Sequence, residues 1–245
     1  MRYKIVIEYN GSNFIGWQKQ KHLSNSIQEI LEKAIFKFSQ QHTTVYVAGR
    51  TDAGVHALGQ VAHFDLTRDF DTYVVRNAIN HHLTPHAIAI LSVEKTDDKF
   101  HARFSAKKRH YLYRIINRYS PLTIDHNRAW LIHNPLNIEN MIQAIEYIKG
   151  NHDFSSFRAR HCQSKSPVKT IDDLQIIHNN EYINIHISAI SFLHNQVRII
   201  IGTLVECGKN NFPPEHTKSI LEAKNRSCAG MTAPPYGLYF VKVDY

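Results

Sequence analysis

Residues 49–57 read GRTDAGVHA, and this stretch decides how the rest of the chain is interpreted. It places one carboxylate, Asp52, in a turn whose two flanking glycines tolerate backbone angles that a residue with a Cβ resists. The preceding residues 45–48 are β-prone, and residues 60–66 alternate apolar with polar side chains. We therefore expect Asp52 to lie between two strands. On this stretch alone, Asp52 is either a nucleophile presented to a ligand or part of an ordinary Asp-Ala-Gly turn.

Outward from this stretch, helix and strand patterns alternate along the chain. Ser26 and Glu29 have the spacing of a capping box, which predicts that a helix follows. Its apolar residues form one core-facing stripe at helical spacing: Ile27, Ile30, Leu31, Ala34, Ile35 and Phe38. Further helices are expected at residues 71–80, 138–148, 195–208 and 216–223. Strands are expected at residues 2–9, 87–93, 109–116, 169–177, 182–188 and 238–243. The pattern indicates the α+β class, with helices packed on a sheet.

Basic residues outnumber acidic ones, with 29 Lys and Arg against 21 Asp and Glu and a formal net charge of +8. The excess is clustered, since residues 99–118 hold seven basic residues and no carboxylate. A second basic group consists of Arg158, Arg160, Lys165 and Lys169. Four aromatic residues lie among these cations: Phe104, Tyr111, Tyr113 and Phe157. Such a mixture suits a phosphate backbone with stacked bases, as in structured or partly single-stranded RNA, although a solvated basic surface has the same composition.

The chain lacks the patterns of several other protein classes. Its three cysteines form no CxxC pair, so neither a disulfide framework nor a zinc site is expected. His56 and His63 fall in no metal-binding spacing, and no second acidic residue lies close to Asp52 to share a cation. Neither GxxxxGK[ST] nor GxGxxG occurs, which leaves nucleotide hydrolysis and dinucleotide redox chemistry without a site. We expect no metal and no cofactor.

The compartment is also predicted from missing patterns. The chain contains no run of about 18 apolar residues of the kind that spans a membrane. Arg2 and Lys4 lead directly into an alternating strand pattern, which is not how a secretory signal peptide begins. We therefore expect a cytoplasmic protein that does not associate with a membrane.

Two further side chains are candidates for a site with Asp52. Tyr111 alternates onto the same face of its expected strand as Tyr113. A strand tyrosine can equally be a core aromatic with a satisfied hydroxyl, and this is the interpretation we keep for Tyr113. Arg198 lies at the border of the apolar stripe of its helix and needs a partner there. Asp52 is the partner we expect, because an arginine favours the ionised form of a nearby carboxylate; the alternative is a structural arginine.

The sequence GRTDAGVHA resembles the signature of the TruA-type tRNA pseudouridine synthases. The likeness continues in order at residues 7–12, 16–18, 100–106, 109–113, 152–157, 192–198 and 237–240. Asn10 stands where that family usually has an Asp, and Gln196 where it commonly has a Met. Thr84, His86 and Pro235 depart as well. None of these departures touches a residue that would carry chemistry.

The resemblance implies a role for each site residue. Asp52 is the nucleophile, and Tyr111 stacks on the target base and could take the proton from its carbon 5. Arg198 keeps Asp52 ionised, and Arg50 reaches phosphate or the space left by an extruded base. Leu238 forms an apolar wall of the uracil pocket. The resemblance also implies a pseudouridine synthase-like fold of two related α+β halves, residues 1–105 with the nucleophile loop and residues 106–245 with Tyr111 and Arg198. The halves would share a largely antiparallel mixed sheet with a central catalytic cleft.

The implied activity is isomerisation of uridine to pseudouridine in the anticodon stem-loop of tRNA, at positions 38, 39 and 40. The implied partners are tRNA and a second copy of the chain in a homodimer. Two alternatives stay open at this point. One is a non-catalytic RNA-binding protein or RNA chaperone that keeps the fold, and the other is the same chemistry on an RNA other than tRNA.

Overall fold

The structure, a computed structural model, describes residues 1–20, 22–160 and 162–245. These residues form two compact units: Met1–Arg109 together with Tyr239–Tyr245, and His110–Leu238. The strands pair mostly antiparallel, with parallel pairs as well, and helices pack on them. The α+β class with a mixed, mostly antiparallel sheet is therefore confirmed. The predicted halves at residues 1–105 and 106–245, with a catalytic cleft, stay a prediction. No helix in the described part of the chain is long and apolar enough to cross a membrane.

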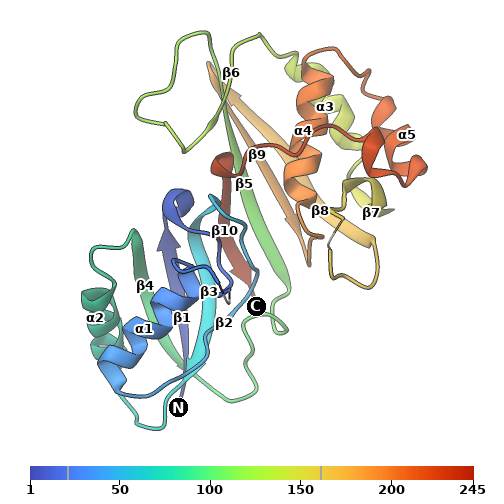
Figure 1. Ribbon diagram of the computed structural model, residues 1–245. Coiled ribbons are helices and arrows are strands. Elements are labelled where there is room, and N and C mark those ends of the chain that lie inside the picture. The colour runs from blue at the N-terminus through green and yellow to red at the C-terminus, as the bar shows by residue number, and fades with distance from the viewer. Residues whose placement is uncertain (21, 161) are drawn as a thin grey trace. The chain divides into compact units, whose positions relative to one another are not determined.

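The first unit is built on three long antiparallel strands in the order β4-β1-β3. Its elements are β1 (Arg2–Tyr9), α1 (Ile27–Ser39), β2 (Tyr46–Val47), β3 (His56–Asp65), α2 (Thr72–Leu83), β4 (Ile88–Thr96) and β10 (Leu238–Asp244), the last from Tyr239 on. A short 3-10 turn, η1 (Gly11–Asn13), follows β1. On the edge of β3 away from β1, His56 and Ala57 pair in parallel with β10, and Ala62 and His63 pair antiparallel with β2. Helices α1 and α2 lie side by side against this sheet (Figure 1).

Alternation and capping explain why these elements form where they do. Tyr3, Ile5 and Ile7 point to the buried face of β1, and the residues between them are more exposed. Helix α1 begins where Ser26 Oγ accepts from Glu29 N at 3.2 Å, so the predicted cap is confirmed. The predicted stripe is also confirmed, with five of its residues buried. This packing gives a rigid sheet, and the connection from β2 to β3 carries Asp52.

The second unit has the strand order β5-β9-β8-β7, with β6 paired in parallel to β5. Its elements are β5 (Lys108–Asn117, from His110 on), β6 (Trp130–Ile132), α3 (Ile138–Glu146), β7 (Gly150–Asp153), β8 (Val168–Asn179), β9 (Tyr182–Ala189), α4 (Gln196–Gly208) and α5 (His216–Ala223). Three 3-10 turns complete it: η2 (Ser155–Phe157), η3 (Arg226–Cys228) and η4 (Pro235–Gly237). Helices α3 and α4 lie side by side (Figure 1).

Helix α4 is more deeply buried than a one-sided stripe predicts. From Gln196 to Gly208, every residue except Arg198 and Glu206 is buried. Gly202 explains part of this, because a Cβ there would lie 1.8 Å from the Met231 carbonyl oxygen, so the segment after η3 runs directly against the helix. Arg198 is thus a half-buried cation on a helix of which only Glu206 is otherwise not buried.

Candidate active site

Asp52 lies in the loop that joins β2 to β3, so the predicted position between two strands is confirmed. The loop is held by side chains from the sheet. Tyr9 Oη and Thr51 Oγ1 share a buried hydrogen bond of 2.8 Å, and Gln60 Nε2 donates to the Gly49 carbonyl at 2.8 Å. Burial raises the pKa of Tyr9 to about 12, so its hydroxyl keeps its proton at neutral pH. The backbone on the N-terminal side of Asp52 is therefore fixed.

A glycine from the N-terminal segment holds the same loop from the other side. Gly16 has φ +101°, and a Cβ there would lie 2.8 Å from the Thr51 carbonyl oxygen. The next residue, Trp17, donates its backbone N–H to that carbonyl at 2.9 Å. Only a residue without a side chain allows this approach. The segment at residues 16–18, which belongs to the resemblance, thus packs on the nucleophile loop.

The turn itself closes after Asp52, where Val55 N donates to the Asp52 carbonyl at 3.2 Å and Gly54 has φ +79°. Asp52 is half-buried and Arg50 is exposed. A half-buried carboxylate on a fixed loop, next to an exposed guanidinium, is an arrangement that can meet one atom of a ligand and one phosphate of an RNA.

Tyr111 and Arg198, the other two predicted catalytic residues, lie in the second unit. Tyr111 is half-buried on β5, and its ring meets the Phe192 ring edge-on, with centroids 5.2 Å apart. This contact fixes the plane of the Tyr111 ring.

Arg198 is held by main-chain and side-chain oxygens of its own unit. Its Nε donates to the Ala233 carbonyl at 2.7 Å, and one of its terminal nitrogens donates to Asn195 Oδ1 at 3.3 Å. The Ala233 N–H donates back to the Arg198 carbonyl at 3.0 Å. Arg198 therefore makes the hydrogen bonds expected of an arginine that helps to hold the fold. The predicted pairing with Asp52 stays a prediction.

Leu238 is buried at the start of β10, directly after Gly237. A Cβ on Gly237 would lie 2.7 Å from Tyr113 Cζ, so this segment packs on the Tyr113 ring. Tyr113 is fully buried and its hydroxyl donates to the Pro234 carbonyl at 2.8 Å, which confirms it as a core aromatic. Burial raises its pKa well above the ordinary value, while nearby Tyr236 adds to the rise and Arg198 opposes it.

The two histidines near the nucleophile loop have structural partners. His56 Nδ1 accepts from Gly11 N at 3.0 Å, and His63 Nδ1 accepts from Ala102 N at 3.1 Å. A Cβ on Gly11 would lie 2.0 Å from the Val55 carbonyl oxygen, so His56 fixes another close approach to the loop. Across the described ranges, no group of three or more His, Cys, Asp or Glu could hold a metal ion. Cys162, Cys207 and Cys228 are free thiols.

Several of the clustered cations are engaged in holding the fold. Arg109 is buried and donates to the carbonyls of Ala48 and Arg103. Arg118 pairs with Glu181 at 2.7 Å. Arg158 donates to two carbonyls of the loop that follows it, at 2.8 and 2.9 Å. The exposed cations of the two basic groups are Lys99, Arg103, Lys107, Arg160 and Lys165.

Sequence reasoning missed the groups that hold the site residues. Gln60, Gly11 and Gly16 support the Asp52 loop, and the Ala233 carbonyl supports Arg198. Gly11 and Gly16 could have signalled the close approaches, since each meets backbone where a Cβ would collide. A backbone carbonyl carries no signal in the sequence. These contacts hold two separate parts of the candidate site in place: the loop that carries Asp52, and the side chain of Arg198.

Comparison with known proteins identifies the class of this chain. The family model described as "tRNA pseudouridine synthase" matches residues 5–105 and 144–245. The chain is 91% identical to tRNA pseudouridine synthase A of Ehrlichia chaffeensis, 83% to that of Ehrlichia canis and 59% to that of Wolbachia pipientis wMel. Each alignment covers 100% of both chains. Among solved structures, a Cbf5-Nop10-Gar1 complex aligns at TM-score 0.34 and 9% identity, over 97% of this chain and 57% of the other.

Proposed function

The chain belongs to the tRNA pseudouridine synthase family, and from this premise we propose that Asp52 is the nucleophile with which it acts on uridines of the tRNA anticodon stem-loop. The chain is an isomerase that converts uridine to pseudouridine in tRNA. The resemblance described above extends to the residues that carry this chemistry. Asp52, Tyr111 and Arg198 stand at the matching positions.

The reaction changes connectivity without changing composition. The Asp52 carboxylate adds to the target nucleoside, and the glycosidic bond between N1 and C1′ breaks. The uracil turns while it is held, and C5 forms the new bond to C1′. The C5 proton leaves and N1 gains a proton, so substrate and product are isomers. The Asp52 bond to the nucleoside breaks before the product leaves, which returns the carboxylate.

The observation that supports Asp52 best is the way its loop is held. Gln60 fixes the residue at the start of the loop, Tyr9 fixes Thr51, and Gly16 allows the N-terminal segment to pack on the same peptide. A nucleophile must meet its target with little loss of conformational freedom at the moment of reaction. An anchored, half-buried carboxylate meets this requirement, whereas an ordinary surface turn needs no such support.

The remaining side chains have supporting roles. Tyr111 stacks on the target base and takes the C5 proton, and Leu238 forms an apolar wall of the uracil pocket. Arg198 pairs with the Asp52 carboxylate. Arg50, which is exposed, contacts phosphate or fills the space of the extruded base. No metal and no cofactor takes part in this scheme.

The target location is tested by mapping the product. An unmodified tRNA transcript is incubated with the purified protein, and pseudouridine is mapped chemically along the whole tRNA. We expect it at positions 38, 39 and 40, the location that the family resemblance implies, and the end of a stem is also the least costly place to unstack and flip a paired base. Modification confined to the T arm, or found only in RNA other than tRNA, would refute this location. Absence of product in every RNA would refute the catalytic assignment.

The working protein is a cytoplasmic homodimer in this proposal. One subunit of 28.4 kDa offers limited surface for an L-shaped tRNA, and two basic subunits offer more. One subunit then holds the body of the tRNA while the Asp52 of the other acts on the anticodon arm. Sedimentation at the concentration of the activity assay tests this, since a fully active monomer would contradict it.

A further inference from the structure

An exposed aromatic ring lies on the turn that precedes β5. Phe104 is 75% exposed, although a phenylalanine side chain usually lies in the core. Its ring centroid lies 4.4 Å from that of His101, and the Arg103 guanidinium lies over it at 5.6 Å. Tyr46, itself 48% exposed, lies 5.6 Å from the His101 ring. These three rings, Tyr46, His101 and Phe104, are called here the aromatic strip.

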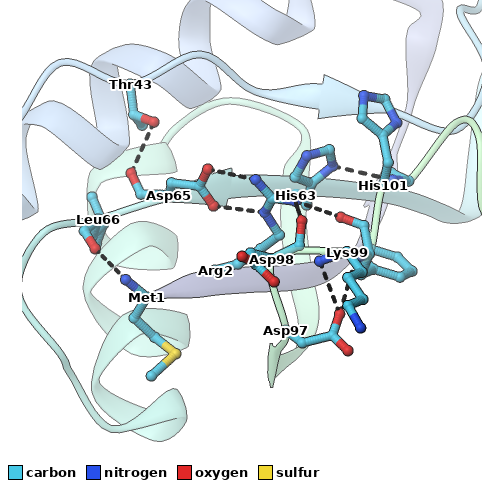
Figure 2. A network of polar contacts seen from close by, with 12 residues as sticks. Met1, Arg2, Thr43, His63, Asp65, Leu66, Asp97, Asp98, Lys99 and His101 are labelled. Atoms are coloured by element: carbon cyan, nitrogen blue, oxygen red, sulfur yellow. Dashed lines mark hydrogen bonds and ion pairs between the residues drawn. The ribbon is translucent and has the colours of Figure 1, made fainter.

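The turn that carries the strip is firmly anchored, so the exposure of Phe104 does not come from a loose loop. Arg2 pairs with Asp65 and donates to the Phe100 carbonyl at 2.7 Å. Figure 2 shows Arg2 between Asp65 and this turn, with His63 and His101 beside it. His63 and Tyr245 then hold the backbone of Ala102, the first through its N–H and the second through its carbonyl.

One buried arginine connects the strip to the nucleophile loop. Arg109 Nη2 donates to the Arg103 carbonyl at 2.7 Å and to the Ala48 carbonyl at 2.9 Å. Ala48 directly precedes the nucleophile loop at residues 49–57, and Tyr46 lies two residues before Ala48. The Arg109 side chain therefore links the backbone beside Phe104 to the backbone that leads to Asp52, both within the first unit.

The charge around the strip suits an RNA strand. Lys99, Arg103 and Lys107 are exposed, and residues 99–118 contain no carboxylate. Two carboxylates, Asp97 and Asp98, directly precede this stretch, and Asp97 accepts from the backbone N–H groups of Lys99 and Phe100. Aromatic rings beside cations bind unpaired nucleotides, because each base stacks on a ring while its phosphate meets a cation.

We infer that the aromatic strip is a stacking subsite for an unpaired nucleotide of the RNA substrate, at the opposite end of β3 from the loop that carries Asp52. The base stacks on the exposed ring of Phe104, beside His101, and Arg103 contacts the phosphate. This inference rests on the proposed function, since it takes the tRNA substrate as the RNA that stacks on the strip. The subsite would increase the affinity of the first unit for RNA, whereas Asp52 is required for the reaction itself.

The chain offers a matched control in Tyr73 on α2. This ring is 66% exposed, and the Arg76 guanidinium lies over it at 5.6 Å, as Arg103 lies over Phe104. Its neighbours in sequence include the carboxylates Asp69 and Asp71, which repel phosphate. Substitution of Tyr73 therefore removes an equally exposed ring without removing the proposed subsite.

The first test measures RNA affinity in the Asp52→Asn background with a labelled, unmodified tRNA by fluorescence anisotropy. Phe104→Ala should weaken binding about tenfold, within the range found when one stacked base loses its ring. Phe104→Trp should bind as tightly as the parent, and Tyr73→Ala should bind within about twofold of it. Equal RNA affinity of Phe104→Ala and the parent would overturn the inference. So would a Phe104→Ala variant whose sedimentation changes while its RNA affinity does not, because the ring would then contact a second copy of the chain.

The second test reports stacking directly. The parent already emits from Trp17 and Trp130, so the emission change of each variant on tRNA binding is taken relative to that of the parent. The added emission of Phe104→Trp should be quenched, and that of Tyr73→Trp should not, since only the first ring meets a base. Binding without quenching at position 104 would refute the subsite. Product formation by the parent with Asp52 intact is measured in parallel. Loss of that activity in every RNA would refute the proposed function, whereas an active parent with an unaffected Phe104→Ala variant would refute only the subsite.

Discussion

Arg198 and Ala233 are joined by two hydrogen bonds: Arg198 Nε donates to the Ala233 carbonyl at 2.7 Å, and the Ala233 N–H donates to the Arg198 carbonyl at 3.0 Å. The segment that carries Ala233 is itself held against α4, where Thr203 Oγ1 accepts from Gly230 N at 3.0 Å. The main chain of one segment thus sets the direction of the guanidinium. The position of this charge is fixed by the fold rather than by solvent.

Arg198→Lys should lower turnover about 100-fold or more while RNA affinity changes little, because a lysine ammonium lacks the Nε donor and the planar fork. Turnover is measured in single-turnover reactions with saturating enzyme. Arg226→Lys is the matched control, since Arg226 holds the same segment through the Ala229 carbonyl and Thr232 Oγ1. The control should keep most of its turnover. Equal losses in both variants would mean that Arg198 acts only as a structural anchor.

Tyr111→Phe should bind RNA normally and turn over about 100-fold more slowly, because the ring keeps its edge contact with Phe192 and only the hydroxyl is lost. Tyr113→Phe is the control for loss of a hydroxyl on the same strand. It should cost about 1 kcal/mol of stability, since the hydrogen bond to Pro234 is lost, and leave turnover largely intact. Near-normal turnover of Tyr111→Phe would restrict Tyr111 to stacking.

Gly16→Ala should impair turnover more than RNA affinity. Its Cβ would lie 2.8 Å from the Thr51 carbonyl oxygen, so the peptide next to Asp52 must shift. Gly150→Ala is matched in backbone angle, with φ +97° against +101°, yet its Cβ meets nothing closer than His152 Nε2 at 3.6 Å. Both variants should lose about 1–2 kcal/mol of stability from backbone strain, and only the first should lose turnover. Equal turnover in the two variants would contradict the support of the loop by Gly16.

The protein should lose stability in mild acid because His63 is buried next to His101 and Arg2. This environment lowers the pKa of His63 to about 4, whereas an unfolded histidine titrates near 6.5. Between these values the unfolded state binds more protons, so the free energy of unfolding falls as the pH falls from about 6.5 to about 4. His63→Gln, which still offers an acceptor to Ala102 N, should flatten this part of the profile. The free energy of unfolding is measured at each pH by urea unfolding, followed by tryptophan fluorescence. The same pH dependence in variant and parent would argue against the role of His63.

Periodicity in the sequence was sufficient to predict most elements of the fold. Strand β1 and helix α5 have the predicted bounds, because alternation and helical spacing are local properties. Strands β6 and β7 were not predicted. The second reads Gly150-Asn151-His152-Asp153, and it is a strand because it pairs with β8, which is a property of the folded unit and not of those four residues.

The parts of the site that depend on local sequence were also predicted, and those that depend on contacts between distant segments were not. The glycines around Asp52 indicated a special turn, and the turn is present between β2 and β3. The sequence could not distinguish a buried cation from a surface one: Arg109 was counted with the RNA-facing charges, yet it is buried and holds Ala48 and Arg103. Its role depends on backbone carbonyls from two distant segments. Every residue has a backbone carbonyl, so the sequence does not show which carbonyls will accept a hydrogen bond from Arg109.

The measurement that tests the central claim most directly is pseudouridine formation by Asp52→Asn in unmodified tRNA. The asparagine keeps the size of the side chain and leaves the hydrogen bonds that Tyr9 and Gln60 make to the loop in place, while it removes the nucleophilic charge. The account predicts a folded variant that binds tRNA like the parent and forms no detectable pseudouridine, even with saturating enzyme and long incubation. Pseudouridine formed by Asp52→Asn at a rate near that of the parent would contradict it.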